Sequence, residues 1–312
     1  MIARGGTAID PHALMSIKSL QLRARAVVEG FMKGIHRSPH HGFSVEFTEY
    51  RQYTPGDDTR HLDWRLFARS DRYYVKRFED ETNLRCTLVV DSSRSMGYRS
   101  GAYSKGDYAR TAAATLAHFL ELQRDAVGLL TFEDKITDYL PPRHRPGHLR
   151  RLIGMLEREP TGRATDLDGP LGQVAATVRK RGLVVLISDL LAPAGTLRAR
   201  LGALRSRGHE VVVLRVLDPA ELSFAFDTPA TFRDVETGRR MEIEPDAARA
   251  GYLARFAAHA AEIERACADH GIEYRSIATD RPLELLLFDL LKARMRARGG
   301  RRAPAPGRGA PR

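Results

Sequence analysis

The sequence has little of what marks a secreted or membrane-spanning protein. Only two of its 312 residues are cysteines, Cys86 in a strand-like run and Cys267 in a helical pattern, so we expect two buried thiols rather than a disulfide or a zinc site. No apolar run approaches the ~20 residues that a membrane span needs. Residues 1–10 lack the apolar segment of a signal peptide. Together these absences predict a cytoplasmic protein.

Motifs of several enzyme classes are also missing. The sequence contains no G-x-x-x-x-G-K-[ST] phosphate loop and no G-x-S-x-G nucleophile elbow. An aspartyl phosphatase of the D-x-D type needs a second aspartate where this chain has Ser93. We therefore expect no enzymatic activity, and a metal-assisted hydrolase or phosphatase stays as the alternative.

Acidic residues are scarce at the C-terminal end. Between Lys292 and Arg312 the chain has eight basic residues and no acidic one. The formal net charge of +11 comes mostly from this end, because the remaining 42 basic residues nearly balance 39 acidic ones. Residues 299–312 lack apolar bulk, so we expect a disordered basic tail. The simplest role of the tail is solubility, and binding of nucleic acid or an anionic surface is the alternative.

Between residues 86 and 291, short apolar runs alternate with amphipathic stretches. The clearest expected helix covers residues 105–122, where Ser104 and Asp107 fit a capping box. The alternation predicts an α/β fold with a doubly wound, mainly parallel sheet. The expected strands cover residues 86–91, 126–132, 183–189, 209–217 and 272–278.

Two segments stand outside this alternation. Residues 11–35 have the apolar spacing of an amphipathic helix, which we expect to pack on the body of the protein. Residues 219–245 predict a β-hairpin that is inserted before a long helix at 246–270. We expect this hairpin to pack with strands from residues 43–80 into a small antiparallel β subdomain.

The most informative stretch contains Asp91, Ser93 and Ser95, directly after an apolar run that predicts a buried strand. A carboxylate and two hydroxyls at alternate positions of a strand-ending loop can converge on one point. Such hard oxygen donors suit Mg²⁺, Ca²⁺ or Mn²⁺ rather than Zn²⁺. Asp and Ser are also common in turns, and a D-x-S-x-S motif by itself is more often a turn than a metal site.

Two distant segments supply further oxygen ligands. Thr165 precedes a helical pattern, and Asp189 ends a second apolar run. Ligands of open α/β sheets bind beyond the carboxyl ends of the strands, at the point where strand order reverses. Thr165 is also compatible with a helix cap, and Asp189 with the start of a loop. The joint pattern favours a metal site formed by Asp91, Ser93, Ser95, Thr165 and Asp189.

These five residues resemble the metal-ion-dependent adhesion site (MIDAS) of von Willebrand factor type A domains. The order of strands, helices and loops between them is similar to that fold. Residues 49–65, EYRQYTPGDDTRHLDWR, are similar to the hallmark of the bacterial domain-of-unknown-function family fifty-eight, whose members have a type A-like domain. The resemblance covers residues 40–295.

The resemblance implies a metal-dependent protein-interaction module rather than an enzyme. In type A-like sites one coordination position stays open, and an acidic side chain of a partner can fill it. Members of this family are commonly encoded beside MoxR-type AAA+ ATPases. The implied partner is therefore such an ATPase or a client that it shares, with this chain as adaptor or co-chaperone.

On this basis we expect four segments along the chain. They are an N-terminal amphipathic helix and loop (residues 1–40), a β-rich hallmark region (41–82), a type A-like domain with an inserted hairpin at 219–245 (83–298), and the basic tail (299–312).

Overall fold

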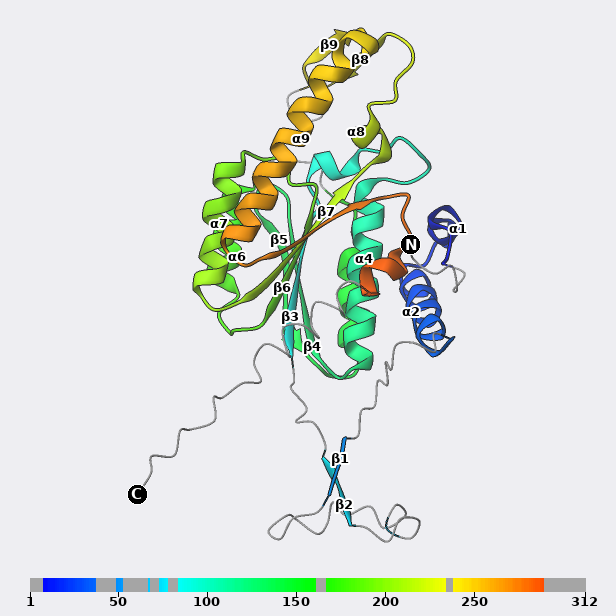
Figure 1. Cartoon of the computed structure of the whole chain (residues 1–312), viewed down its shortest axis with the longest axis vertical. Coiled ribbons are helices and arrows are strands. Elements are labelled where there is room, and N and C mark those ends of the chain that lie inside the picture. The colour runs from blue at the N-terminus through cyan, green and yellow to red at the C-terminus, as the bar shows by residue number, and fades with distance from the viewer. Residues whose placement is uncertain are drawn as a thin grey trace, which may run out of the picture.

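A six-stranded sheet forms the centre of the computed structural model, in the order β10–β7–β6–β3–β4–β5 (Figure 1). The structure describes residues 8–37, 49–52, 67, 73–77, 84–160, 167–233 and 238–288. The strands of the sheet are β3 (Arg85–Asp91), β4 (Ala126–Phe132), β5 (Ile136–Arg143), β6 (Leu183–Ser188), β7 (Glu210–Leu217) and β10 (Glu273–Ala278).

All neighbouring strands of this sheet are parallel except β4 and β5, which form an antiparallel pair. From β3 the chain first adds β4 on one side and later returns to add β6 on the other side. The order therefore reverses between β3 and β6, which is where ligands of open α/β sheets bind. The expected fold class, a doubly wound, mainly parallel α/β sheet, is confirmed.

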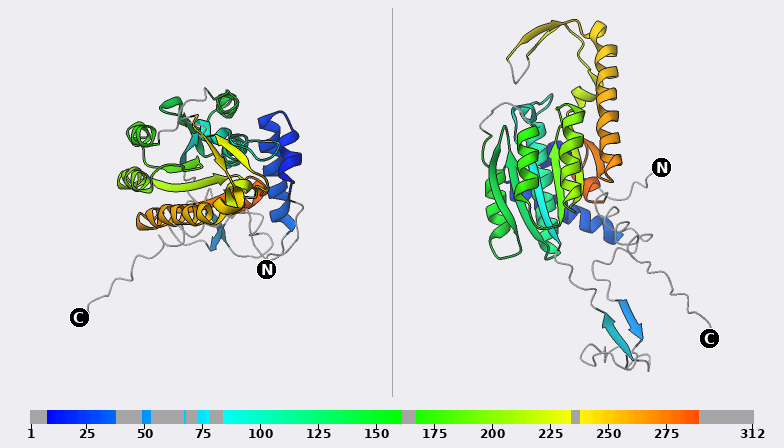
Figure 2. Two further views of the ribbon diagram at one scale, coloured as in Figure 1. Left: turned by 90° about the horizontal axis from the view of Figure 1, so that it is seen from above. Right: turned by 90° about the vertical axis from the view of Figure 1, so that its left-hand side faces the viewer.

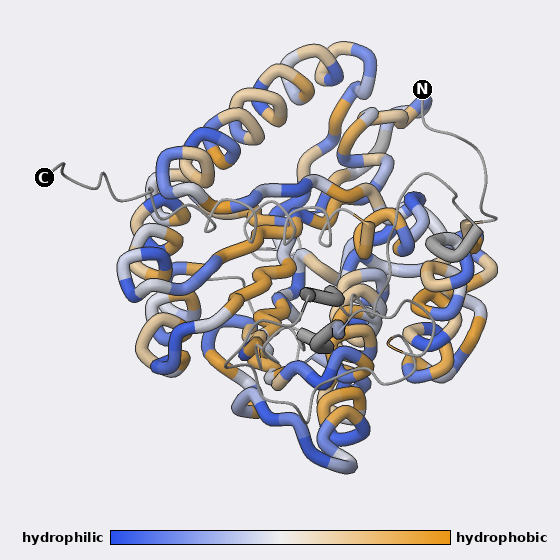
Figure 3. The backbone as a smooth tube through the Cα atoms, turned by 60° about the horizontal axis from the view of Figure 1, so that its bottom comes forward, coloured by the Kyte–Doolittle hydropathy of each residue, from blue (hydrophilic) through white to orange (hydrophobic). Residues whose placement is uncertain are grey.

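The central strands are apolar along their whole length because helices cover both faces of the sheet. Leu88, Val89 and Val90 of β3 are fully buried, and β6 is buried throughout. Figure 3 shows hydrophobic residues concentrated along the strands and polar residues along the outer turns of the helices. Each fully buried Leu or Val contributes roughly 1.5–3 kcal/mol.

Two groups of helices cover the sheet, one on each face (Figure 2). One core lies under α2 (Leu20–Arg37), α4 (Lys105–Leu122) and α5 (His148–Leu156), and the other under α6 (Asp168–Thr177), α7 (Ala194–Ser206) and α9 (Pro245–Asp269). Helix α4 begins at the predicted capping box, since Ser104 and Asp107 each accept a hydrogen bond from the backbone N–H of the other.

The N-terminal helix packs on α4 as expected, through Ala24, Val28 and Phe31. The predicted single helix over residues 11–35 is wrong in one respect. The segment forms α1 (Pro11–Ser16) and then α2, with a break at residues 17–19. Ile17 has an extended backbone and ends α1, and Asp10 caps the start of α1.

Two small antiparallel sheets lie apart from the main sheet. They are β1 (Glu49–Gln52) with β2 (Tyr74–Arg77), and β8 (Ala230–Arg233) with β9 (Arg240–Ile243). The inserted hairpin is thus confirmed. Its expected packing with residues 43–80 is wrong, because the two pairs form separate sheets at opposite ends of the molecule (Figure 1).

Aromatic contacts tie the hairpin to the rest of the chain. Phe232 of β8 contacts Phe224 and Phe226, and Phe224 contacts Tyr252 of α9. These rings hold β8 and β9 beside the first turns of α9, beyond the carboxyl edge of the sheet (Figure 2). The hairpin therefore packs on its own chain neighbours instead of on the N-terminal strands.

Cys86 and Cys267 are both buried thiols outside any disulfide, as predicted. None of the helices in the described ranges is long and apolar enough to cross a bilayer.

Candidate metal centre at the strand ends

The two predicted carboxylates end the two strands that flank the reversal of strand order. Asp91 is the last residue of β3, and Asp189 directly follows β6. The strands are neighbours, with Val90 opposite Ile187. Both aspartates are buried. The structure therefore brings Asp91 and Asp189 together, although 98 positions separate them in the chain.

Asp91 is held by two hydroxyl-bearing neighbours. Its Oδ1 accepts a hydrogen bond from the backbone N–H of Ser93 at 2.9 Å, and its Oδ2 accepts one from the Ser188 hydroxyl at 2.6 Å. Burial, and then the nearby Asp189 carboxylate, raise the pKa of Asp91 to about 7, while the bonds from Ser188 and Ser93 act in the opposite direction. A carboxylate with so high a pKa is poorly compensated by its surroundings.

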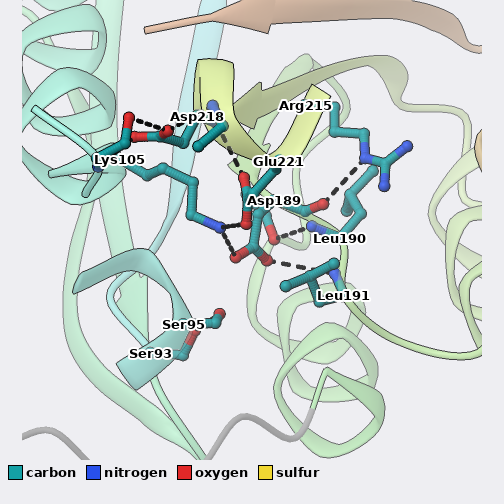
Figure 4. A network of polar contacts seen from close by, with 12 residues as sticks. Ser93, Ser95, Lys105, Asp189, Leu190, Leu191, Arg215, Asp218 and Glu221 are labelled. Carbon is teal, nitrogen blue, oxygen red and sulfur yellow. Dashed lines mark hydrogen bonds and ion pairs between the residues drawn. The ribbon is translucent and has the colours of Figure 1, made fainter. Parts of the chain in front are cut away.

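Ser93 and Ser95 lie at the start of the short 3-10 helix η2 (Arg94–Gly97). Both are buried, and their hydroxyl oxygens are 3.2 Å apart. Figure 4 shows the two side chains on the side of Asp189 away from the Glu221 side chain. Three of the predicted ligands, Asp91, Ser93 and Ser95, thus come from one turn, and Asp189 comes from the neighbouring strand end.

Asp189 is already bonded to a cation of this chain. The Nζ atom of Lys105 lies 2.8 Å from its Oδ2, and the backbone N–H of Leu191 donates to its Oδ1 at 3.2 Å (Figure 4). Lys105 also lies 2.6 Å from Oε1 of Glu221. The side chains of Lys105 and Asp189 are both fully buried. Removing two charges from water costs free energy. The attraction between them offsets this cost only when they are close and hydrogen-bonded, as Lys105 and Asp189 are.

Burial alone would lower the pKa of Lys105, but the charges and hydrogen bonds of Asp189 and Glu221 outweigh it, so that pKa is raised. Lys105 therefore stays charged in the metal-free protein. It is the first residue of α4, where the helix dipole disfavours a cation. Its place is explained by the two carboxylates and not by the needs of the helix.

A second buried cation, Arg215, bonds the backbone of Asp189. The Nε atom of Arg215, in β7, donates to the backbone oxygen of Asp189 at 3.0 Å. The guanidinium lies 5.0 Å from the Phe256 ring centre, and its Nη2 lies 3.4 Å from Nδ1 of His259. The Nε2 atom of His259 faces the Ala192 carbonyl oxygen at 2.9 Å. Nε2 therefore carries the proton, and Nδ1 accepts from Arg215.

Helix α8 (Pro219–Ser223) completes the network. Asp218 and Glu221 form a capping box at its start, in which Oε2 of Glu221 accepts from the backbone N–H of Asp218 at 2.9 Å. The backbone N–H of Ser100 donates to Asp218 at 2.9 Å, and the Tyr252 hydroxyl donates to the backbone oxygen of Glu221 at 3.0 Å. These bonds fix the Glu221 carboxylate beside Lys105.

Among the residues that the structure describes, the network has more acid than base. Its side chains include four carboxyls, of Asp91, Asp189, Asp218 and Glu221, against two basic groups, of Lys105 and Arg215. A divalent cation would balance the two extra negative charges when all four carboxyls are ionised. Carboxylate and hydroxyl oxygens are also the donors that Mg²⁺ and Mn²⁺ prefer. The donor chemistry and the charge of the site both fit such an ion.

Thr165, the fifth predicted ligand, lies outside the described residues, as does most of the hallmark at 49–65. Within the described parts of the chain, no group of three or more His, Cys, Asp or Glu side chains is arranged to hold a metal ion. The candidate centre differs from such groups because half of its four described donors are hydroxyls.

Sequence reasoning missed Lys105 and Arg215, the two cations of the site. Each had a visible signal. Arg215 is the single charged residue in the apolar run from Val211 to Leu217, and a lysine is unusual at the first position of a helix. It also missed α8, whose D-P-A-E start, from Asp218 to Glu221, has the spacing of a capping box.

The strand order and the D-x-S-x-S turn define a type A-like α/β protein. The model of the family described as "Protein of unknown function DUF58" matches residues 49–262, more than half of the chain. The chain belongs to this family, as its hallmark predicted.

Two curated relatives differ in how much of the chain they match. An uncharacterized protein of Mycobacterium tuberculosis is 30% identical over 277 residues, which are 87% of this chain and 86% of that protein. An uncharacterized protein of Mycobacterium avium is 33% identical over 155 residues, which are 49% of this chain and 90% of that protein.

Solved structures with similar folds are remote. An aerotolerance-related membrane protein from Bacteroides fragilis is 16% identical, with a TM-score of 0.45, and covers 67% of this chain and 99% of its own. The SpRpn10 VWA domain is 14% identical, with a TM-score of 0.38, and covers 65% of this chain and 94% of its own. Because both scores are low, the fold assignment rests on the strand order and the family match.

Proposed function

We propose that this protein is a non-enzymatic, divalent-cation-dependent protein-interaction module. The observation that carries the proposal is the meeting of Asp91, Ser93, Ser95 and Asp189 at the point where strand order reverses. In the proposal these residues and Thr165 hold Mg²⁺ or Mn²⁺, directly or through water. The ion would supply an electrophilic position that a carboxylate from another protein can occupy.

The surroundings of the site support a docking role. Leu191, two residues after Asp189, is 44% exposed, and Leu222, next to Glu221, is 41% exposed. Exposed leucines beside a buried charged centre resemble a protein-interaction surface, in which apolar contacts surround one strong polar contact. The hydroxyl oxygens of Ser93 and Ser95 lie 3.2 Å apart, close enough to bind one common ion.

The proposed partner is a MoxR-type AAA+ ATPase or a client that it shares, and the family resemblance is its only support. An acidic side chain of that partner would complete the shell of the metal. With an intracellular ATPase as partner, the proposal also keeps a cytoplasmic location.

A Mn²⁺ titration followed by paramagnetic resonance tests the metal. The wild-type protein should bind Mn²⁺, and the combined Asp91→Ala and Ser93→Ala variant should lose that binding by at least about a hundredfold, because two ligands are removed. The matched control combines Asp269→Ala with Ser206→Ala, which removes the same groups from exposed helix ends. Equal binding by all three proteins would reject the metal centre.

A pulldown with the ATPase encoded beside the gene tests the partner. Recovery should fall when EDTA is present and when Asp189 is replaced by Ala. Equal recovery with and without EDTA would place the docking surface elsewhere. Phosphatase or protease activity that depends on Asp91 would favour the hydrolase instead.

A further inference from the structure

Lys105 is bonded to the Asp189 carboxylate, which is one of the proposed metal ligands. Both oxygens of Asp189 already accept a hydrogen bond, Oδ2 from Lys105 and Oδ1 from the backbone of Leu191. A metal that uses Asp189, directly or through a bound water, must therefore compete with the Lys105 ammonium. Because both side chains are fully buried, solvent cannot take the place of either partner without a large cost in free energy.

Glu221 gives Lys105 a second position within the same hydrogen-bond reach. Its Oε1 lies 2.6 Å from Nζ, and its Oε2 is fixed by the backbone N–H of Asp218. The carboxylate is largely buried, with 15% of the side chain exposed. A cation that leaves Asp189 therefore keeps a charged partner without reaching water, since Glu221 already contacts it.

We propose that Lys105 is an internal counter-ion that competes with the divalent cation for Asp189, and that Glu221 retains Lys105 once the metal has bound. The proposal rests on the metal centre proposed above and adds two residues to it. Asp189 then has one of two positive partners at all times, Lys105 in the metal-free protein and the metal in the loaded one. The metal affinity of the site is set by this competition as well as by its ligands.

The proposal makes opposite predictions for replacements of Lys105 and of Glu221. Lys105→Met keeps most of the length of the side chain and removes the competitor. Mn²⁺ should then bind about tenfold more tightly or better, because a charge at hydrogen-bond range shifts the proton affinity of a neighbouring carboxylate by ~1–3 log units. Glu221→Gln leaves Lys105 dependent on Asp189 alone, so Mn²⁺ should bind about tenfold more weakly.

A double variant separates competition from simple attraction. Glu221 also attracts a metal through space, whether or not Lys105 is present. If Glu221 acts through Lys105, Glu221→Gln should have little effect in a Lys105→Met background. Asp218→Asn is the matched control, because it removes a neighbouring carboxylate that does not bond Lys105 and leaves a good helix cap. Its effect on Mn²⁺ affinity should be smaller than that of Glu221→Gln.

Mn²⁺ affinities of the full chain, measured by calorimetry and paramagnetic resonance for these variants, decide the proposal. Weaker or unchanged binding by Lys105→Met, or the same loss from Glu221→Gln in both backgrounds, would overturn it. Binding by Lys105→Met alone would support it in its strongest form. If neither the wild type nor Lys105→Met binds Mn²⁺, the metal centre and the counter-ion are both rejected. If Lys105→Met does not fold, equal losses from Glu221→Gln and Asp218→Asn overturn the proposal.

Discussion

The two edges of the parallel sheet differ in whether their charged side chains bond one another. At the amino ends of the strands, basic groups bond backbone carbonyl oxygens: Arg85 that of Pro142, Arg205 that of His209, His209 that of Val178 and His148 that of Val127. Burial lowers the pKa of His148 there and favours its neutral form. At the carboxyl ends, by contrast, buried charged side chains bond one another through Lys105, Asp189 and Glu221.

The difference separates the two roles of polar groups in this fold. The bonds at the amino edge satisfy carbonyls that would otherwise be unpaired, which any fold must do. The ion pairs of Lys105 with Asp189 and Glu221 at the carboxyl edge are not required for that, and a buried ion pair is often no more stable than apolar residues of the same volume. Their presence beside Asp91 is consistent with the metal centre that we propose.

The largest expected effect is on the free energy of unfolding when the Lys105–Asp189 pair is broken. Asp189→Asn keeps an acceptor for the Leu191 N–H but removes the charge that faces Lys105. The metal-free protein should lose about 3 kcal/mol, the low end of the cost of breaking a buried ion pair, because Glu221 still faces Lys105. Arg205→Gln at the amino edge should cost no more than about 1 kcal/mol, because only hydrogen bonds to carbonyls are lost.

Urea unfolding of both variants in EDTA measures the comparison. Similar losses would mean that the two edges serve the same structural role.

The next effect is a pH dependence of the stability of the metal-free protein. The pKa of Asp91 is raised to about 7 in the fold, so the folded state binds this proton more tightly than the unfolded chain. The contribution of Asp91 to stability is therefore full below its ordinary pKa near ~4 and is lost as the pH rises through about 7. Relative to Asp91→Asn, the wild type should lose a few kcal/mol over that window, of the order that such a shift implies.

Unfolding curves in EDTA between pH 4 and pH 8 provide the test. Parallel pH profiles for the wild type and Asp91→Asn would mean that folding does not raise the pKa of Asp91. Saturating Mn²⁺ should remove the loss, because a bound cation favours the ionised form.

Much of this architecture could be predicted from local pattern. The apolar runs predicted β3 and β6, the rule on strand ends predicted that Asp91 and Asp189 meet, and the capping box predicted the start of α4. These features depend on neighbouring residues or on the period of a strand, so the sequence displays them directly.

The cations of the site could not be predicted in the same way. Lys105 is buried because Asp189 and Glu221, 84 and 116 positions later, surround it, and a sequence pattern does not show which distant groups will meet. The separate packing of the two small sheets could not be predicted for the same reason. The hairpin packs near Phe224 and Tyr252, which lie closer to it in the chain than residues 43–80 do.

A smaller effect is expected at the start of α4, the helix that carries Lys105 into the charged edge. The Ser104 hydroxyl accepts the Asp107 N–H at 3.0 Å, and Asp107 accepts the Ser104 N–H at 3.0 Å. Ser104→Ala should cost about 1 kcal/mol of unfolding free energy, as the loss of a helix cap usually does. Ser104→Thr keeps the acceptor and should cost less. If Ser104→Ala costs nothing, the Lys105 network and not the cap fixes this end of the helix.

The smallest expected effect is that of removing residues 299–312, which lie outside the described residues. Their composition offers no large apolar side chain to a core, so the melting temperature should not change within error. Mn²⁺ affinity should not change either, because the proposed ligands are all elsewhere. If the full chain binds nucleic acid, the deletion should weaken that binding, and the binding itself should be salt-dependent and independent of base sequence. Filter binding at two salt concentrations distinguishes the outcomes. Binding that persists after the deletion would move the contact from the tail to another basic surface, and the arginines of the amino edge would then be the first to replace.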